Sequence, residues 1–232
     1  MSTHRRTAAI AGVLYLLTIV TSIPALVLKS PVLAGTVSAD ALAGARLAMV
    51  LELVLAVACV GTAVVLHPVL RRYSEALSLG FVVARTVEAA TIVLGMIAVL
   101  ALGTREPATG AAGPVLVAVH NWAFLIGPGL IPAVNALCLG TVLFRARLVP
   151  RIIPTVGLIG APLLIASALA TIAGHLDQVS TLAGALALPI AAWELTLGLW
   201  LTVKGFRPEA IEHLDHAVQP IGDRPAVEAL KA

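Results

Sequence analysis

The sequence predicts an all-α membrane protein, a six-transmembrane-helix bundle with both termini in the cytoplasm (N-in/C-in). Its composition, six long apolar runs and the placement of its basic residues each predict this fold. Of 232 residues, 59% are hydrophobic and 12% are charged, whereas a soluble domain is about one quarter charged. A soluble fold of this size could not cover so much apolar surface, so we expect that surface to face a lipid bilayer.

Each of the six runs is long enough to cross a hydrocarbon core about 30 Å thick. They span residues 8–28, 44–66, 78–102, 115–144, 152–174 and 182–203. The first run follows two arginines, so a cleavable signal peptide is the alternative interpretation. It is disfavoured because the run exceeds a typical signal core and no small-x-small cleavage pattern precedes Lys29. We expect residues 1–205 to form the transmembrane domain and the proline-broken residues 206–232 to form a polar cytoplasmic tail.

The basic residues predict the orientation of the bundle. They cluster at the termini and on alternate connections, and only Lys29 and Arg105 are expected in the opposite loops. By the positive-inside rule the clustered side is cytoplasmic. This set comprises Arg5, Arg6, Arg71, Arg72, Arg145, Arg147, Arg151, Lys204, Arg207, Arg224 and Lys231. The net charge of +3 is therefore attributed to topology, and we expect no nucleic-acid partner.

Charged and amide side chains inside the runs are candidates for a functional site. An ionised group in the bilayer core costs at least about 2.5 kcal/mol on insertion scales. Arg85 and Glu88 are three residues apart and can pair on one helix face. Counting 1.5 Å per residue places Glu88, Asn135 and Glu194 at similar depths near the midplane. We expect these four residues to form one ligand-binding pocket, extended toward the outside by Glu52, His120 and Asn121, with His120 solvated near the interface.

The fourth run contains the segment GPGLIP at residues 127–132. Two prolines remove backbone donors and two glycines loosen the helix, so a kink or a short unwound stretch is expected. Broken helices near the midplane expose backbone groups to substrates in many transporters. The break therefore indicates a binding cavity close to Asn135.

Catalytic and metal-binding patterns are missing from the sequence. No HExxH, GxSxG, P-loop or dinucleotide fingerprint occurs, and Cys59 and Cys138 have no CxxC spacing. His120 is the only histidine within the predicted runs, whereas a zinc site needs several converging ligands. The sequence therefore identifies no catalytic residue, metal site or cofactor, and it favours a protein that is not an enzyme.

Small residues recur every four positions in the fifth run. They are Gly157 and Ala161, followed by Ala166, Ala170 and Gly174. Such a stripe allows helices to approach closely. We interpret it as packing inside the bundle, and the alternative is a contact with a second copy or with another membrane protein.

Several motifs carry a family resemblance. They are AGVLYLLT at residues 11–18, ARTVEA at 84–89, GTVLFR at 140–145, LVPR at 148–151 and GLIG at 157–160. Together they resemble the bacterial DUF4386 group, a domain of unknown function with six membrane spans, and the likeness covers residues 8–203. The resemblance implies a bacterial cytoplasmic (inner) membrane location and no particular activity.

Two hypotheses for function follow from the polar residues. In the first, the protein binds or transports a small ligand or ion through the midplane pocket. In the second, the intramembrane charges only lock the bundle, and the protein is a structural or regulatory partner of other membrane proteins.

Overall fold

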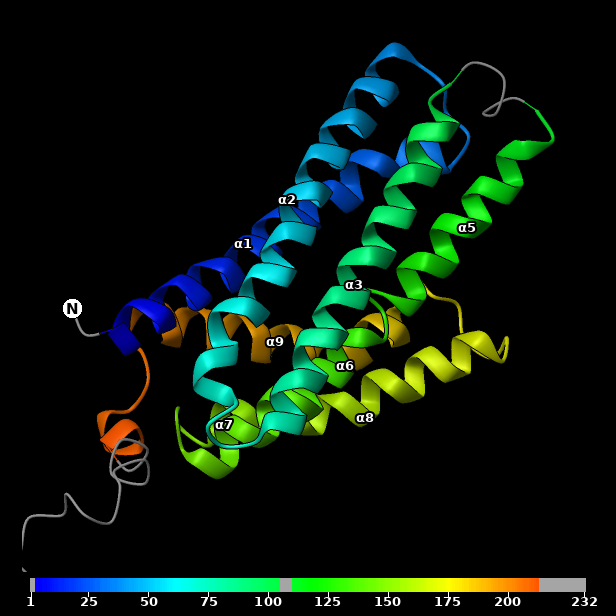
Figure 1. Ribbon diagram of the computed structural model, residues 1–232. Coiled ribbons are helices and arrows are strands. Elements are labelled where there is room, and N and C mark those ends of the chain that lie inside the picture. The colour runs from blue at the N-terminus through cyan, green and yellow to red at the C-terminus, as the bar shows by residue number, and fades with distance from the viewer. Residues whose placement is uncertain (1–2, 105–109, 213–232) are drawn as a thin grey trace, which may run out of the picture.

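The computed structural model describes residues 3–104 and 110–212, and all the regular structure in those ranges is helical (Figure 1). Six helical spans are long and apolar enough to cross a membrane, so the chain is a multi-pass membrane protein. Five of them are single helices: α1 (Thr3–Leu33), α2 (Ala39–Leu70), α3 (Glu75–Leu102), α8 (Ile152–Ile172) and α9 (Thr181–Val203). The other consists of α5 (Ala112–Ile126), α6 (Ile131–Asn135), the π-helical turn η1 (Ala136–Gly140) and α7 (Thr141–Ala146).

The helices begin and end where local chemistry dictates. Ser38, Ser74 and Ser180 precede α2, α3 and α9, and each side-chain oxygen accepts a hydrogen bond from a backbone N–H of the first turn. Gly35 follows the end of α1 with φ of 85°, a conformation that favours glycine. α1 therefore continues well past residue 28, where the apolar run was predicted to end.

The helices pack in sequence around a shared centre (Figure 1). α1 packs against α2 and α9, α3 packs against α2 and α5, and α8 packs against α9 and the segment from α6 to α7. α5 lies against α3 but makes no extended contact with α1, α8 or α9. The two ends of the bundle domain meet, because Arg5 donates hydrogen bonds to the carbonyl oxygens of Leu201, Thr202 and Val203 at the end of α9.

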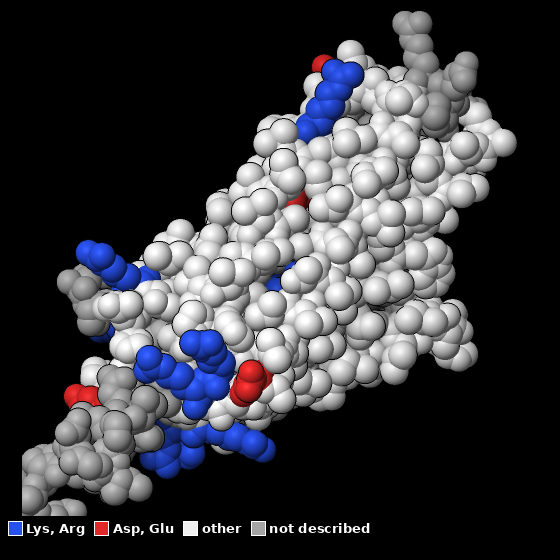
Figure 2. Space-filling view, viewed as in Figure 1, with Lys and Arg blue, Asp and Glu red and all other residues white. Residues whose placement is uncertain are grey.

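Basic side chains gather at one end of the molecule (Figure 2). We call this the basic end; it contains the α2–α3 and α7–α8 turns, with Arg71, Arg72, Arg145, Arg147 and Arg151. The opposite end, with the α1–α2 and α8–α9 loops, is the far end. Arg46 belongs to the far-end half of α2 and is exposed, as expected for a side chain that extends toward the interface. Arg105 lies outside the described residues.

The two ends are packed differently. At the basic end, buried side chains from every span form one core that includes Tyr15, Leu70, Phe81, Leu139 and Trp193. Toward the far end, a second core contains buried residues of α1, α2 and α3, and no described residue of α8 or α9 belongs to it. The bundle is therefore closed at the basic end and more loosely assembled toward the far end.

The small residues of α8 lie mainly inside the bundle. A Cβ added at Gly157 would meet the Trp193 ring at 2.5 Å, and one at Gly160 would meet the Ile190 backbone at 3.0 Å. Ala161 is fully buried, whereas Ala166 and Gly174 are exposed. Gly157 and Ala161 thus lie inside the bundle as expected, and Gly157 and Gly160 allow α9 to approach α8 closely.

Candidate functional site

Four predicted site residues meet in the interior. Arg85 of α3 donates to Glu88 Oε2 and to Glu194 Oε1 of α9, both at 3.0 Å. Asn135, at the end of α6, donates through Nδ2 to the same Glu88 Oε2 at 2.7 Å. These four residues, the Arg85 cluster, join three helices. The convergence expected from their common depth is present in the structure.

The Arg85 cluster carries a charge imbalance. One guanidinium faces two carboxylates, so with all three groups ionised its formal charge is −1. Arg85 and Glu88 are buried, with side-chain exposures of 1% and 7%, while the Glu194 side chain is 16% exposed. Arg85 donates one bond to Oε2 of Glu88 and one to Oε1 of Glu194. The other oxygen of each carboxylate can therefore still accept a hydrogen bond. A mobile cation or proton would balance this excess.

Aromatic and sulfur atoms complete the surroundings of the guanidinium. Its Cζ lies 4.8 Å from the centre of the Tyr15 ring and 5.8 Å from that of Phe81, both within the range of cation–π attraction. Nη1 also contacts Cys59 Sγ at 3.7 Å. Arg85 Nε and Asn135 Oδ1 are buried and have no hydrogen-bond partner among the described residues. Unsatisfied buried polar atoms are uncommon and call for a physical reason.

A cavity of about 150 Å³ adjoins this cluster. Arg85, Glu88 and Glu194 supply its charged wall, and Thr18, Pro128 and Pro132 lie among its other lining residues. The ion-paired network is therefore not sealed by packing on all sides. It presents charged side chains to a space large enough for water or a small ion.

The predicted break in the fourth span is confirmed and lies beside this cavity. α5 ends at Ile126 and α6 begins at Ile131. Gly127 approaches α3 so closely that an added Cβ would lie 2.0 Å from Thr91 Oγ1. The π-helical turn that follows Asn135 is the kind of irregularity often found at functional sites. The irregular backbone thus brings Asn135 and both prolines to the centre of the bundle.

Glu52 does not join the Arg85 cluster, and Lys29 does not lie in a loop. The loop position expected for Lys29 was wrong: Lys29 is in α1, 2% exposed, and its ammonium is hydrogen-bonded to Glu52 of α2. A carboxylate at this depth needs a cation, and α1 continues to Leu33, far enough to supply one. The interior therefore holds two separate charged groups.

His120 also departs from expectation, and Asn121 lies beside it. His120 is 3% exposed rather than solvated, because it stacks on Phe124 at a centroid distance of 6.2 Å and lies over Gly95 of α3. Asn121 is exposed, and its Oδ1 lies 3.2 Å from His120 Nδ1. Neither residue contacts the Arg85 cluster; both belong to the neighbourhood of Lys29 and Glu52.

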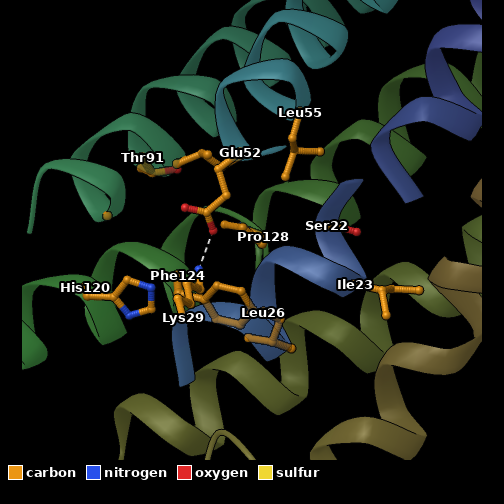
Figure 3. Close-up of a pocket in the computed structure, with 12 residues that line it drawn as sticks. Ser22, Ile23, Leu26, Lys29, Glu52, Leu55, Thr91, His120, Phe124 and Pro128 are labelled. Atoms are coloured by element: carbon orange, nitrogen blue, oxygen red, sulfur yellow. Dashed lines mark hydrogen bonds and ion pairs between the residues drawn. The ribbon is translucent and has the colours of Figure 1, made fainter. Parts of the chain in front are cut away.

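A second cavity, of about 200 Å³, lies in that neighbourhood (Figure 3). Figure 3 shows Lys29 reaching Glu52 across it, with His120 and Phe124 on one side. It shares Ser22, Leu55, Ile92 and Pro128 with the cavity beside Arg85. The two cavities are therefore neighbours.

The described residues contain no group of three or more His, Cys, Asp or Glu side chains positioned to hold a metal ion. The charged groups here are instead carboxylates paired with Arg85 or Lys29.

Most of the amino-acid sequence matches one known protein family. Residues 10–205 match the family described as a domain of unknown function, DUF4386. The chain belongs to the DUF4386 family. No curated protein and no solved structure matches it. The family match spans all six helical spans, so it includes both charged groups of this DUF4386 protein, and it assigns them no activity.

The sequence patterns did not identify four residues that contact Arg85 or line the second cavity. They are Lys29, Tyr15, Phe81 and Thr91. A signal was available for Lys29, since Glu52 had no assigned cation and three of the four residues that follow Lys29, as far as Leu33, are apolar. The aromatic partners of Arg85 carry no comparable signal, because an aromatic residue in an apolar run looks the same whether it faces lipid or a guanidinium.

Proposed function

We propose that this DUF4386 protein binds, and passes between the two sides of the membrane, a small cation at the Arg85 cluster. The observation that carries the proposal is the pairing of one arginine with two carboxylates beside a cavity. An excess negative charge in a medium of low dielectric constant is unfavourable unless a positive charge or a proton joins it. A small cation in the cavity satisfies that requirement.

Glu194 is the residue expected to contact the cation most directly. It lines the cavity and is the more exposed of the two carboxylates. Glu88 is engaged by both Arg85 and Asn135, so it is better suited to fixing the geometry. Asn135 Oδ1, which is buried and has no hydrogen-bond partner among the described residues, is a neutral acceptor in the same cluster. Small cations prefer such oxygen ligands.

The test is thermal unfolding of the purified protein in detergent at constant ionic strength, with sodium, potassium, methylammonium or N-methylglucammonium chloride. At least one small cation is expected to raise the unfolding midpoint relative to the bulky N-methylglucammonium, because binding to the native state stabilises it. Glu194→Gln should abolish that rise while leaving Arg85 paired with Glu88. Glu75→Gln, which removes an exposed carboxylate at the start of α3, is the matched control and should retain it.

Equal midpoints in all four salts would contradict the proposal, as would a cation response that survives Glu194→Gln. In the alternative hypothesis the Arg85 cluster only locks the bundle. That hypothesis predicts equal midpoints for every cation together with a lower midpoint for each variant of the cluster.

We also propose that the basic end lies in the cytoplasm of a bacterium, with residues 1–205 as the transmembrane domain and residues 206–232 as a cytoplasmic tail. Residues 213–232 lie outside the described residues. The arginines of the α2–α3 and α7–α8 turns support this orientation. The burial of Lys29 strengthens it, since that lysine no longer counts as a far-end loop charge.

Cysteine labelling tests the orientation. Cys59 and Cys138 are first replaced by alanine, and one new cysteine is then introduced as Val179→Cys at the far end or Ala76→Cys near the basic end; both positions are exposed. In intact cells a membrane-impermeant maleimide should label only the Val179→Cys variant. Labelling of Ala76→Cys before the cells are opened would reverse the assigned orientation.

A further inference from the structure

The side chain of Lys29 points into the bundle rather than toward the nearer helix end. The Leu28 backbone lies beside Gly44, where an added Cβ would be 3.1 Å from Leu28 O. Glu52 is eight residues further along α2, about 12 Å deeper toward the middle of the bundle. A lysine that serves only as a topological anchor extends toward the interface. Lys29 extends in the opposite direction, so its ammonium is available to groups inside the bundle.

The ammonium brings unused hydrogen-bonding capacity to the second cavity. Its only hydrogen bond to a described residue is the one to Glu52, and it lies 5.4 Å from the centre of the Phe124 ring. An ammonium has three donors, so two remain available. His120 adds an acceptor: with Nδ1 donating to the Asn121 oxygen at 3.2 Å, the neutral ring has its lone pair on Nε2.

The mouth of this cavity is apolar. Ile23 and Leu26 line it and are also 62% and 47% exposed, so they belong both to the cavity wall and to the outer surface. α1 and α5 flank the cavity without extended contact with each other. In a membrane the outer surface at this depth is lipid, so the cavity communicates with the hydrocarbon between these two helices.

The charges of the lining residues favour a neutral ligand. Lys29 and Glu52 together are neutral, so an ionised head group would stay uncompensated in a region of low dielectric constant. A neutral hydroxyl instead accepts a hydrogen bond from Lys29 and donates one to Glu52 or His120. The volume of about 200 Å³ is below the roughly 300 to 1,000 Å³ of pockets that enclose a whole ligand. The cavity therefore suits a head group and the first part of a chain that continues into lipid.

We infer that the Lys29–Glu52–His120 cavity is a binding site for a neutral, lipid-soluble molecule with a hydroxyl head, entering from the bilayer between α1 and α5. This inference is independent of cation binding at Arg85, because it rests on different charged residues and on a different cavity.

The test uses a long-chain alcohol carrying a diazirine on its alkyl chain, photolysed with the protein in phosphatidylcholine vesicles. Peptide mapping is expected to place the label on α1 and α5 around Leu26 and Phe124. Excess 1-decanol should reduce that labelling, and decane should not. Decylammonium should compete at least about tenfold less well than 1-decanol, because an uncompensated charge in the membrane interior costs more than the 1.4 kcal/mol that corresponds to a factor of ten.

Two variants make the test specific. Gly95→Leu fills the cavity beside His120, and Gly184→Leu is the matched control because nothing lies within 4 Å of a Cβ at Gly184. Labelling that competes with 1-decanol should be lost in the first variant and retained in the second. The double variant Lys29→Met, Glu52→Gln keeps the cavity open without its charges and should lose the preference for decanol over decane.

Three results would overturn the inference. They are a label spread evenly over lipid-facing helices, equal competition by decane and 1-decanol in the wild-type protein, and a double variant that still prefers decanol. The double variant decides the question even if Gly95→Leu does not fold.

Discussion

Arg85→Met is expected to lower the free energy of unfolding by about 3 to 5 kcal/mol, the range observed when one partner of a buried ion pair is removed. The change leaves Glu88 and Glu194 facing one another without a cation. It also removes the guanidinium contacts with Tyr15 and Phe81. The measurement is unfolding in mixed micelles with increasing dodecyl sulfate, followed by circular dichroism at a helical wavelength.

A triple variant separates stability from function. Arg85→Met combined with Glu88→Gln and Glu194→Gln removes every charge of the cluster, and such replacements are often neutral or stabilising. We expect it to recover most of the stability lost in the single variant while showing no response to cations. If the triple variant is as unstable as Arg85→Met alone, unpaired charge is not the cause of the loss.

Gly12→Ala is expected to destabilise the protein by about 2 to 3 kcal/mol, despite the higher helix propensity of alanine. α1 crosses α9 at Gly12, where an added Cβ would lie 2.5 Å from Thr202 N and 2.7 Å from Gly198 O. These are backbone atoms of α9, so they cannot turn aside, and the two helices must separate. The same dodecyl sulfate titration measures the effect.

Gly184→Ala is the matched control, since it is also a glycine inside a helix but faces open space. Its free energy of unfolding should be unchanged or raised by up to about 1 kcal/mol. Equal effects of the two substitutions would show that helix propensity, rather than the α1–α9 approach, decides the outcome.

The six spans were predictable because a bilayer imposes one length and one chemistry on every crossing segment. The grouping of Arg85, Glu88, Asn135 and Glu194 was predictable for a related reason. Helical rise converts residue number into depth, and polar groups at equal depth in the membrane are stabilised by hydrogen-bonding to one another. The helix break was predictable from the two prolines and two glycines between residues 127 and 132.

The partners of Glu52 and the state of His120 were not predictable in the same way. Depth counting gives no rotation about the helix axis, so it cannot tell which neighbour Glu52 faces. The end of an apolar run also does not mark the end of a helix, and Lys29 was therefore assigned to a loop. His120 depends on the missing side chain at Gly95, a contact between helices that a single sequence does not reveal.

The break between α5 and α6 has a mechanical consequence. α5 carries His120 and Phe124, and among the long helices it makes extended contact only with α3, whereas Asn135 lies beyond the break in a segment that packs against α3 and α8. Rotation about residues 127–130 would tilt α5 relative to α6 and would change the width of the Lys29–Glu52–His120 cavity. The basic-end core could stay fixed during that motion, so one side of the protein could open while the other remained shut.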